Sequence, residues 1–277
     1  MRPHSTGAGP GRPLVRSAAA LLAAVLVVTL GGCAARRLAL PSGAGEPFAE
    51  YAAAFEQATR TCGAIDTMTA ELSVSGRVEG QRLRGRVISG FARPSKLRLE
   101  GLAPFGPPAF ILVSTGGDAT LLLPRDPAVL EGERPEAIID ALVGIPLAPA
   151  TLHRILAGCG PAASTPAAGV SFAGGWLRVD GEDGTSTWLQ QDQAGRWTIR
   201  AGRADALLVE YEERAGGLPR RIRLELEQAA PPTELRLHVA EADLNVPLGD
   251  DAFQVKVPPA ATAITLAELR RAGPLGR

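Results

Sequence analysis

Apolar and polar positions alternate along much of the chain. Residues 70–78 and 81–87 alternate strictly, with a two-residue turn between them, and the same period returns in 221–227 and 234–239. Side chains of a strand point to its two faces in turn, so this pattern predicts strands with one buried and one solvated face. With the short apolar runs, the predicted strands cover residues 70–78, 81–87, 96–100, 110–114, 120–123, 176–179, 187–191, 196–200, 207–213, 220–227, 234–240 and 252–257.

The period changes to three or four residues in four segments, which predict helices. These segments are residues 47–61, 135–143, 149–157 and 264–271. The two central segments begin with proline and are followed by glycine, which favours a helix start and a helix stop. Residues 160–169 are mostly Pro, Ala, Ser, Thr and Gly and predict a loop.

From these twelve segments we expect roughly ten or eleven antiparallel strands with few helices, and this number limits the architecture. An open sheet of this size must curl, close or be covered, because large flat sheets are disfavoured. We therefore predict a mainly β fold with helices (α+β). Its sheet is strongly curved and antiparallel, or an incomplete β-barrel, and a helical lid on its concave side encloses an apolar cavity.

The first 33 residues have the pattern of an exported, anchored protein. A basic start without acids precedes a short apolar run and a Gly-Gly-Cys ending, as in secretory signal peptides. Residues 30–33 resemble a bacterial lipobox, which implies that Cys33 is acylated and becomes the first residue. An ordinary secreted protein with a chance cysteine is the alternative. We expect a signal peptide over 1–32, an acylated cysteine and flexible tether over 33–46, and one domain over 47–277.

The charge balance excludes one class of partner. The whole chain has 29 basic and 29 acidic residues, and removal of the predicted signal leaves it mildly acidic. Non-specific nucleic-acid binding needs clustered positive charge, so we expect no nucleic acid. The apolar core of the first segment is too short for an ordinary membrane-spanning helix, and no second apolar segment is long enough to cross a bilayer. Membrane attachment would therefore depend on acylated Cys33.

Two cysteines remain after Cys33. Cys62 and Cys159 each end a predicted helix and each precede a glycine. An exported chain occupies an oxidising compartment, where an even pair suggests a disulfide. Two separate buried thiols are the alternative.

Catalytic chemistry has little support in the sequence. After the signal, the histidines are His153 and His238, and neither lies in a zinc or nucleophile motif. We predict no enzyme, no metal and no cofactor.

Three short segments, taken in order, resemble the LolA/LolB-like lipoprotein carrier and receptor family. They are residues 101–106, residues 142–147 followed by a helix, and residues 250–259 followed by 264–269. The resemblance implies an incomplete antiparallel barrel with helices over an apolar cavity. It also implies that the protein carries lipoproteins through the periplasm or receives them at the outer membrane. The chain departs from the receptor in length and in its cysteine pair, which leaves the cargo open.

The candidates for binding are one residue of a loop and a set of apolar residues that are expected to line the cavity. Phe105 lies in a Pro- and Gly-rich loop, where it would either plug the barrel or project as a membrane or carrier contact; the resemblance favours the contact. The other group comprises the expected cavity lining: Phe55, Leu72, Val74, Leu97, Leu99, Ile111, Val113, Ile138, Leu142, Leu152, Leu156 and Trp188.

Together these observations predict a monomeric membrane-anchored lipoprotein that binds acyl chains of lipids or lipoproteins. Its role would be lipoprotein sorting or lipid transfer, with a periplasmic carrier as a further partner. The expected location is the periplasmic face of the outer membrane, with the inner membrane left open. The alternative is a non-enzymatic interaction or sensor module on the same fold.

Overall fold

The computed structural model describes residues 37–273, and the compact unit that begins at Leu40 holds the helices and strands discussed below. The predicted signal peptide and Cys33 lie outside the described residues. The domain boundaries proposed above stay predictions.

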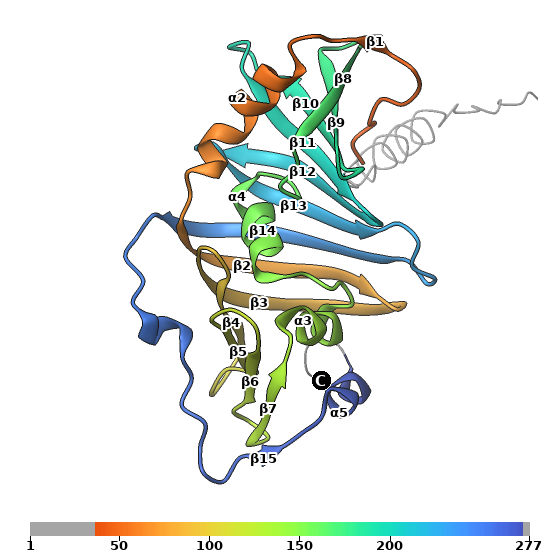
Figure 1. Cartoon of the computed structure of the whole chain (residues 1–277). Coiled ribbons are helices and arrows are strands. Elements are labelled where there is room, and N and C mark those ends of the chain that lie inside the picture. Colours follow the sequence, from red (N-terminus) through yellow and green to blue (C-terminus); the bar gives the residue numbers. More distant parts are fainter. Residues whose placement is uncertain (1–36, 274–277) are drawn as a thin grey trace, which may run out of the picture. The chain divides into compact units, whose positions relative to one another are not determined.

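One large open sheet dominates the described residues (Figure 1). Its order is β1-β8-β9-β10-β11-β12-β13-β14-β2-β3-β4-β5-β6-β7-β15. Neighbouring strands are antiparallel, except that β15 runs parallel to β7. The strands are β1 (Glu46–Pro47), β2 (Thr67–Val78), β3 (Gln81–Ala92), β4 (Lys96–Leu102), β5 (Phe110–Ser114), β6 (Ala119–Leu123), β7 (Ala128–Glu133), β8 (Pro166–Phe172), β9 (Trp176–Gly181), β10 (Ser186–Gln191), β11 (Trp197–Ala204), β12 (Leu207–Ala215), β13 (Leu218–Leu226), β14 (Thr233–Leu244) and β15 (Thr262–Ala263).

The central hairpin follows directly from the sequence. Strands β2 and β3 pair without a break from Thr67↔Ala92 to Val78↔Gln81. The two turn residues, Glu79 and Gly80, have φ angles of 49° and 80°. Positive φ at both turn positions matches the right-handed twist of the flanking strands. The strict alternation of the sequence therefore becomes one inner apolar face and one outer polar face.

Four α-helices accompany the sheet in the described residues: α2 (Tyr51–Gly63), α3 (Pro135–Val143), α4 (Pro149–Ala157) and α5 (Leu266–Ala272). Proline occupies the first turn of α3 and of α4. Each ends at a glycine in the left-handed region, Gly144 and Gly158. Proline's fixed φ suits a helix start, and glycine has no Cβ to oppose positive φ. Both predicted ranges are therefore confirmed to the residue.

The core lies between these helices and the inner face of the sheet. Ile138 of α3 and Ile155 of α4 are fully buried, as are Leu97, Leu112 and Leu121 of the sheet. Figure 1 shows α3 and α4 in front of the same side of the sheet. The predicted fold class, a mainly β chain with an open curved sheet and helices, is confirmed.

The strand count exceeds the predicted ten or eleven. Strands β7 and β8 and the two-residue strands β1 and β15 were absent from the prediction. Strand β8 has the sequence Pro-Ala-Ala-Gly-Val-Ser-Phe, whose intrinsic β propensity is low. It is extended because β1 and β9 pair with its two edges, which is tertiary information.

The prediction of a strand over residues 252–257 is wrong. Asp250–Phe253 forms a short 3₁₀ helix, and the chain then runs without a strand partner. Arg98 explains part of this difference, because its Nη1 donates to the carbonyl oxygens of Ala252 (3.2 Å) and Gln254 (2.9 Å). The Arg98 side chain therefore supplies hydrogen bonds that a neighbouring strand would supply in a sheet.

A disulfide joins Cys62, near the end of α2, to Cys159, just after α4. The Cα atoms are 5.5 Å apart and the sequence separation is 97 residues. The bond therefore ties the end of α4 to a helix from the beginning of the domain.

Removal of this disulfide should lower stability markedly. In the chain-entropy model a closed loop of about 100 residues contributes about 4–5 kcal/mol. We expect the Cys62→Ser/Cys159→Ser variant to melt well below the parent, and non-reducing peptide mapping to recover the linked peptides from the parent. Free alkylation of both thiols in native protein, or equal melting temperatures, would contradict this expectation.

Candidate functional site

A small cavity lies between the inner face of the sheet and helices α3 and α4. Its volume is about 60 Å³. Every lining side chain is apolar, so the cavity offers burial and no hydrogen bonds. The lining residues are Leu72, Val74, Val87, Leu99, Phe110, Ile139, Leu142, Val143, Leu147, Leu152, Leu224, Leu235 and Leu237.

Residues 135–157, called the lid below, form one wall of this cavity. The α3–α4 loop carries two buried side chains, Ile145 (1% exposed) and Leu147 (2%). The lid fits closely at its bend, because a Cβ added at Gly144 would lie 2.3 Å from Val78 Cγ1. Leu147 and Leu152 lie on either side of the start of α4 and both face the cavity.

Comparisons with known proteins bear on this arrangement. No protein-family model matches the chain, and no similar curated protein was found. Among solved structures, a LolA superfamily protein from Nitrosomonas europaea is similar, with a TM-score of 0.50 and 12% identity over 73% of this chain and 96% of that chain.

Two further structures show weaker similarity. A DUF1329 family protein from Desulfovibrio piger has a TM-score of 0.49 at 13% identity, and a putative outer membrane lipoprotein-sorting protein domain from Vibrio parahaemolyticus has a TM-score of 0.42 at 11% identity. Each covers 73% of this chain and is itself covered to 96%.

The chain has a LolA/LolB-like fold. The predicted resemblance is thereby confirmed at the level of architecture. At 12% identity the similarity shows the fold alone, so the site must be described from this chain's own residues.

Within this LolA/LolB-like fold, five of the predicted lining residues face the cavity: Leu72, Val74, Leu99, Leu142 and Leu152.

Four other predicted lining residues lie in or against the same core cluster without reaching the cavity. Leu97, Ile138 and Leu156 are fully buried there, and Phe55 of α2 packs against it while partly exposed.

Ile111 and Val113 do not line the cavity, which corrects the prediction. Their neighbours Phe110 and Leu112 belong to the core cluster, so Ile111 and Val113 point to the opposite face of β5. The β5 segment is apolar on both faces, and an apolar run without alternation does not reveal which face is inward.

The prediction that Trp188 lines the cavity is also wrong. It belongs to a separate cluster with Ala201 and Leu208, against which Leu40 packs. Its Nε1 donates to the carbonyl oxygen of Pro41 at 3.4 Å. This tryptophan therefore holds the beginning of the described chain.

Eight lining residues were absent from the prediction: Val87, Phe110, Ile139, Val143, Leu147, Leu224, Leu235 and Leu237. Alternation marks Leu224, Leu235 and Leu237 as inward, so a signal for them existed.

One titratable side chain is buried within the lid. His153 of α4 stacks on Phe91 of β3, with ring centroids 5.6 Å apart and an interplanar angle of 10°. Burial lowers the pKa of the imidazole; the charges of Arg93 and Arg154 lower it too, against an opposing effect of Asp66. Its Nε2 has no hydrogen-bond partner among the described residues. A buried imidazole in this setting is held neutral.

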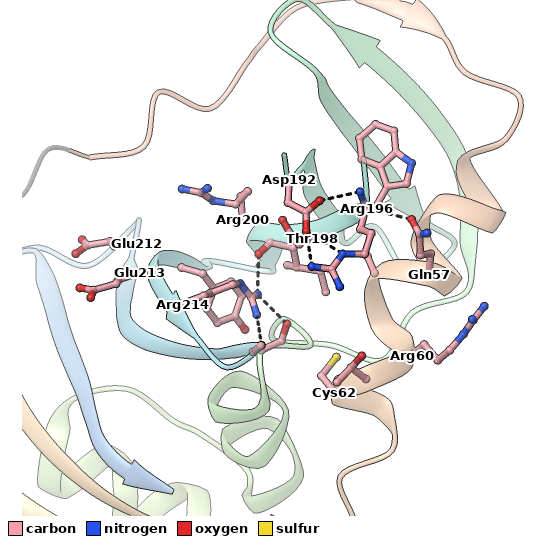
Figure 2. Close-up of a pocket in the computed structure, with 17 residues that line it drawn as sticks. Gln57, Arg60, Cys62, Asp192, Arg196, Thr198, Arg200, Glu212, Glu213 and Arg214 are labelled. Atoms are coloured by element: carbon pink, nitrogen blue, oxygen red, sulfur yellow. Dashed lines mark hydrogen bonds and ion pairs between the residues drawn. The ribbon is translucent and has the colours of Figure 1, made fainter. Parts of the chain in front are cut away.

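A second depression is polar and lies beside α2, β11 and β12 (Figure 2), with a volume of about 570 Å³. Arg196 and Asp192 form an ion pair at 2.9 Å, and Arg214 donates to three backbone carbonyl oxygens. Figure 2 shows Arg60 and Arg200 pointing away from each other. Arg200 Nε, Glu212 Oε1 and Arg214 Nε line this depression and are buried without a hydrogen-bond partner among the described residues.

Residues 37–273 contain no group of three or more His, Cys, Asp or Glu side chains arranged to hold a metal. No helix among these residues is long and apolar enough to span a membrane.

Phe105 lies in the loop between β4 and β5 and is 88% exposed. Arg125, from the turn between β6 and β7, donates from Nη2 to the Phe105 carbonyl oxygen and from Nε to the Pro107 carbonyl oxygen (3.4 Å). The backbone of the loop is thereby held while the ring projects into solvent.

Several turns gather at the end of the sheet where this loop lies. Leu102, just before the loop, pairs with Arg86 in the middle of β3, and β4 there runs toward the end of the sheet at which the β2–β3 turn follows Val78. The α3–α4 loop reaches the same Val78 through Gly144. We call this the hairpin end of the sheet.

Protonation of His153 should destabilise the fold. The unfolded chain takes up a proton below about pH 6.5, whereas the lowered pKa keeps the folded imidazole neutral. The unfolded state therefore binds more protons as the pH falls, so stability decreases below about pH 6.5 until the folded pKa is passed.

We expect His153→Gln to flatten this dependence of the urea midpoint on pH, and His238→Gln, at an exposed histidine, is the matched control. Identical slopes for parent and His153→Gln would contradict the assignment.

Proposed function

We propose that this chain is a lipid-anchored envelope protein that binds acyl chains of lipids or lipoproteins between the lid and the sheet. The observation that carries the proposal is the wholly apolar lining of the cavity in a LolA/LolB-like fold. An acyl chain offers no hydrogen bonds, and this lining requires none. Removing apolar surface from water stabilises the complex by about 25 cal/mol per Å².

The cavity is too small to hold an acyl chain while the lid is closed. Ligand pockets usually enclose about 300–1,000 Å³, and this cavity measures about 60 Å³. An acyl chain therefore enters only when the lid moves outward and the chain takes over contacts that lid side chains make now. The lid's own apolar side chains occupy the site in the absence of cargo.

The attachments of the lid indicate which part moves. The end of α4 is held by the Cys62–Cys159 disulfide and by Tyr211, whose hydroxyl donates to the Ile155 carbonyl oxygen (3.2 Å) and accepts from the Gly160 N–H (2.9 Å). Helix α3 is tied to α5 by an Asp140–Arg270 ion pair at 3.1 Å. Exposed ion pairs contribute about 0–1 kcal/mol, so α3 and its loop open while the end of α4 stays fixed.

The small cavity also favours a second candidate, a non-enzymatic interaction or sensor module. In that case the lid stays closed, the interior serves stability alone, and the protein binds its partner on the outside. The two candidates differ in whether apolar ligand enters the interior.

A variant that fills the cavity tests acyl binding. Leu152→Phe adds volume on α4, the helix whose end stays fixed, and so narrows the space open to an acyl chain. We expect weaker binding of a fluorescent fatty acid, and a folded protein that is less stable by about 1–3 kcal/mol, the usual cost of overpacking. Ile111→Phe makes a similar change on the opposite face of the sheet and should bind as the parent does.

Mass spectrometry of lipids extracted from the purified parent complements this measurement. If no lipid is recovered and the parent does not bind the probe, acyl binding is rejected and the interaction module is favoured.

We propose that Phe105 contacts the membrane or a carrier during transfer. Its exposed ring contributes little to the core, so Phe105→Ala and Phe105→Glu should each change stability by no more than about 0.5 kcal/mol. Phe105→Glu should slow transfer of bound lipid to liposomes, because a charge in an apolar environment is costly.

Leu244→Glu is the matched control for this variant. Leu244 is also an exposed apolar residue, and it lies at the opposite end of the sheet, paired with Met68. Strong destabilisation of both Phe105 variants, or equal slowing of transfer by Leu244→Glu, would refute a specific contact.

We propose that acylated Cys33 supplies the anchor and retains the protein at the periplasmic face of the outer membrane. Cys33→Ser should abolish labelling by a fatty-acid analogue and release the chain from the membrane fraction. The Cys62→Ser/Cys159→Ser variant should still be labelled, which shows that the label reports Cys33. Undiminished labelling of Cys33→Ser would exclude the lipobox interpretation.

A further inference from the structure

The outer face of the sheet carries four exposed arginines at its hairpin end. Arg77 lies on β2, Arg82 and Arg84 on β3, and Arg236 on β14. They line a groove of about 660 Å³, in which Glu234 is the one acidic side chain among the described lining residues. We call this surface the arginine groove.

The register brings these positive charges close together. Arg77 lies directly opposite Arg82 in the β2–β3 pair. Arg84 and Arg236 flank Ser75 from the two neighbouring strands. Like charges directly opposite each other on antiparallel strands are destabilising. An anion bound between them would remove that repulsion.

Within the described residues, one of these four arginines, Arg236, has an acidic partner. Glu234 forms ion pairs with buried Arg223 at 2.5 Å and with Arg236 at 3.0 Å. Within residues 37–273, no acidic side chain forms an ion pair with Arg77, Arg82 or Arg84.

The next arginine along β3 behaves differently. Arg86 points to the same outer face and forms an ion pair with Glu71 at 3.3 Å. Along β3, the excess positive charge is therefore confined to the hairpin end.

We propose that the arginine groove binds phosphate groups of an anionic phospholipid surface. Guanidinium groups match phosphate oxygens in charge and in bidentate geometry. The inference rests on the proposed function, because a membrane-anchored acyl carrier must place its cavity entrance against a bilayer.

The position of Phe105 favours a lipid surface over another anion. The exposed ring and the arginine groove lie at the same end of the sheet, so one approach brings an apolar group and several cations to the bilayer together. Aromatic side chains are favoured at the membrane–water boundary, and basic residues near an anionic leaflet are attracted to it. This docking would turn the bend of the lid toward the membrane.

The test measures how closely the hairpin end approaches the bilayer. The full-length lipidated protein, with a fluorophore on Gln81→Cys beside the turn, is reconstituted into phosphatidylcholine vesicles that contain a nitroxide-headgroup lipid. A second set of vesicles also contains phosphatidylglycerol. We expect stronger quenching in the anionic vesicles, and loss of the difference at about 1 M salt, where the Debye length is about 3 Å.

Variants then assign the effect to the arginine groove. Each basic residue near an anionic surface contributes about fivefold, so Arg82→Gln/Arg84→Gln should reduce the docked population about 25-fold relative to the undocked one. Arg86→Gln/Arg221→Gln removes the same charge from the outer face at arginines already paired with Glu71 and Glu213. It should retain the anionic effect, and melting temperatures check that both variants are folded.

Two results would overturn the proposal: equal quenching in neutral and anionic vesicles, or parent-like quenching by folded Arg82→Gln/Arg84→Gln. Either would direct attention to an acidic protein partner instead. Fatty-acid binding measured in detergent keeps the two hypotheses separate. If it fails in the parent while docking responds to anionic lipid, acyl binding is rejected and the arginine groove stands.

Discussion

Burial of the sheet's inner face is the constraint on which the structure depends. The sheet is open, and its inner face carries leucine, valine and isoleucine side chains from most of its strands. Such a surface must be covered, since exposed apolar area on this scale leads to association. Helices α2, α3 and α4 provide the cover, and α3 with its loop is also the part that cargo would displace.

This dual role makes the attachment of the lid more important than the present size of the cavity. Around the end of α4, Arg214 and Arg154 donate to the carbonyl oxygens of Gly158 (3.4 Å) and Cys159 (3.0 Å), next to the disulfide. Helix α3 depends mainly on apolar contacts and an exposed ion pair. Apolar contacts are non-directional, so an acyl chain can replace them at little net loss of buried area. The end of α4 is held by hydrogen bonds and a disulfide, and α3 is held mainly by apolar contacts. We infer that the lid would pivot at the end of α4.

The sequence predicts those parts that local chemistry determines. Proline and glycine set both ends of α3 and α4, and the two-residue turn sets the register of β2 and β3. The inward positions Leu72, Val74 and Leu99 follow from alternation. Local sequence does not predict the elements that depend on tertiary contacts. Strand β8 is extended because of its neighbouring strands, and hydrogen bonds from Arg98 to the carbonyl oxygens of Ala252 and Gln254 explain part of the absence of a strand over 252–257.

The same difference between local sequence and tertiary environment explains which residues of the cavity the sequence predicted correctly. Ile111 and Val113 were assigned to the wrong face because β5 is apolar on both sides. Which inward residues line the cavity, and which only pack behind it, depends on how the lid lies on the sheet. Leu224 and Leu237 were recognisable as buried, but their place opposite the lid comes from the order of strands β13, β14 and β2.

The most direct measurement is photo-crosslinking with a fatty acid that carries a diazirine along its chain, followed by peptide mapping of the modified protein. Entry of the acyl chain between lid and sheet predicts modified peptides from the lid, residues 135–157, and from the inner face of β2, β13 and β14, with competition by unlabelled fatty acid. Modification confined to the outer face, or insensitive to competition, would contradict the account.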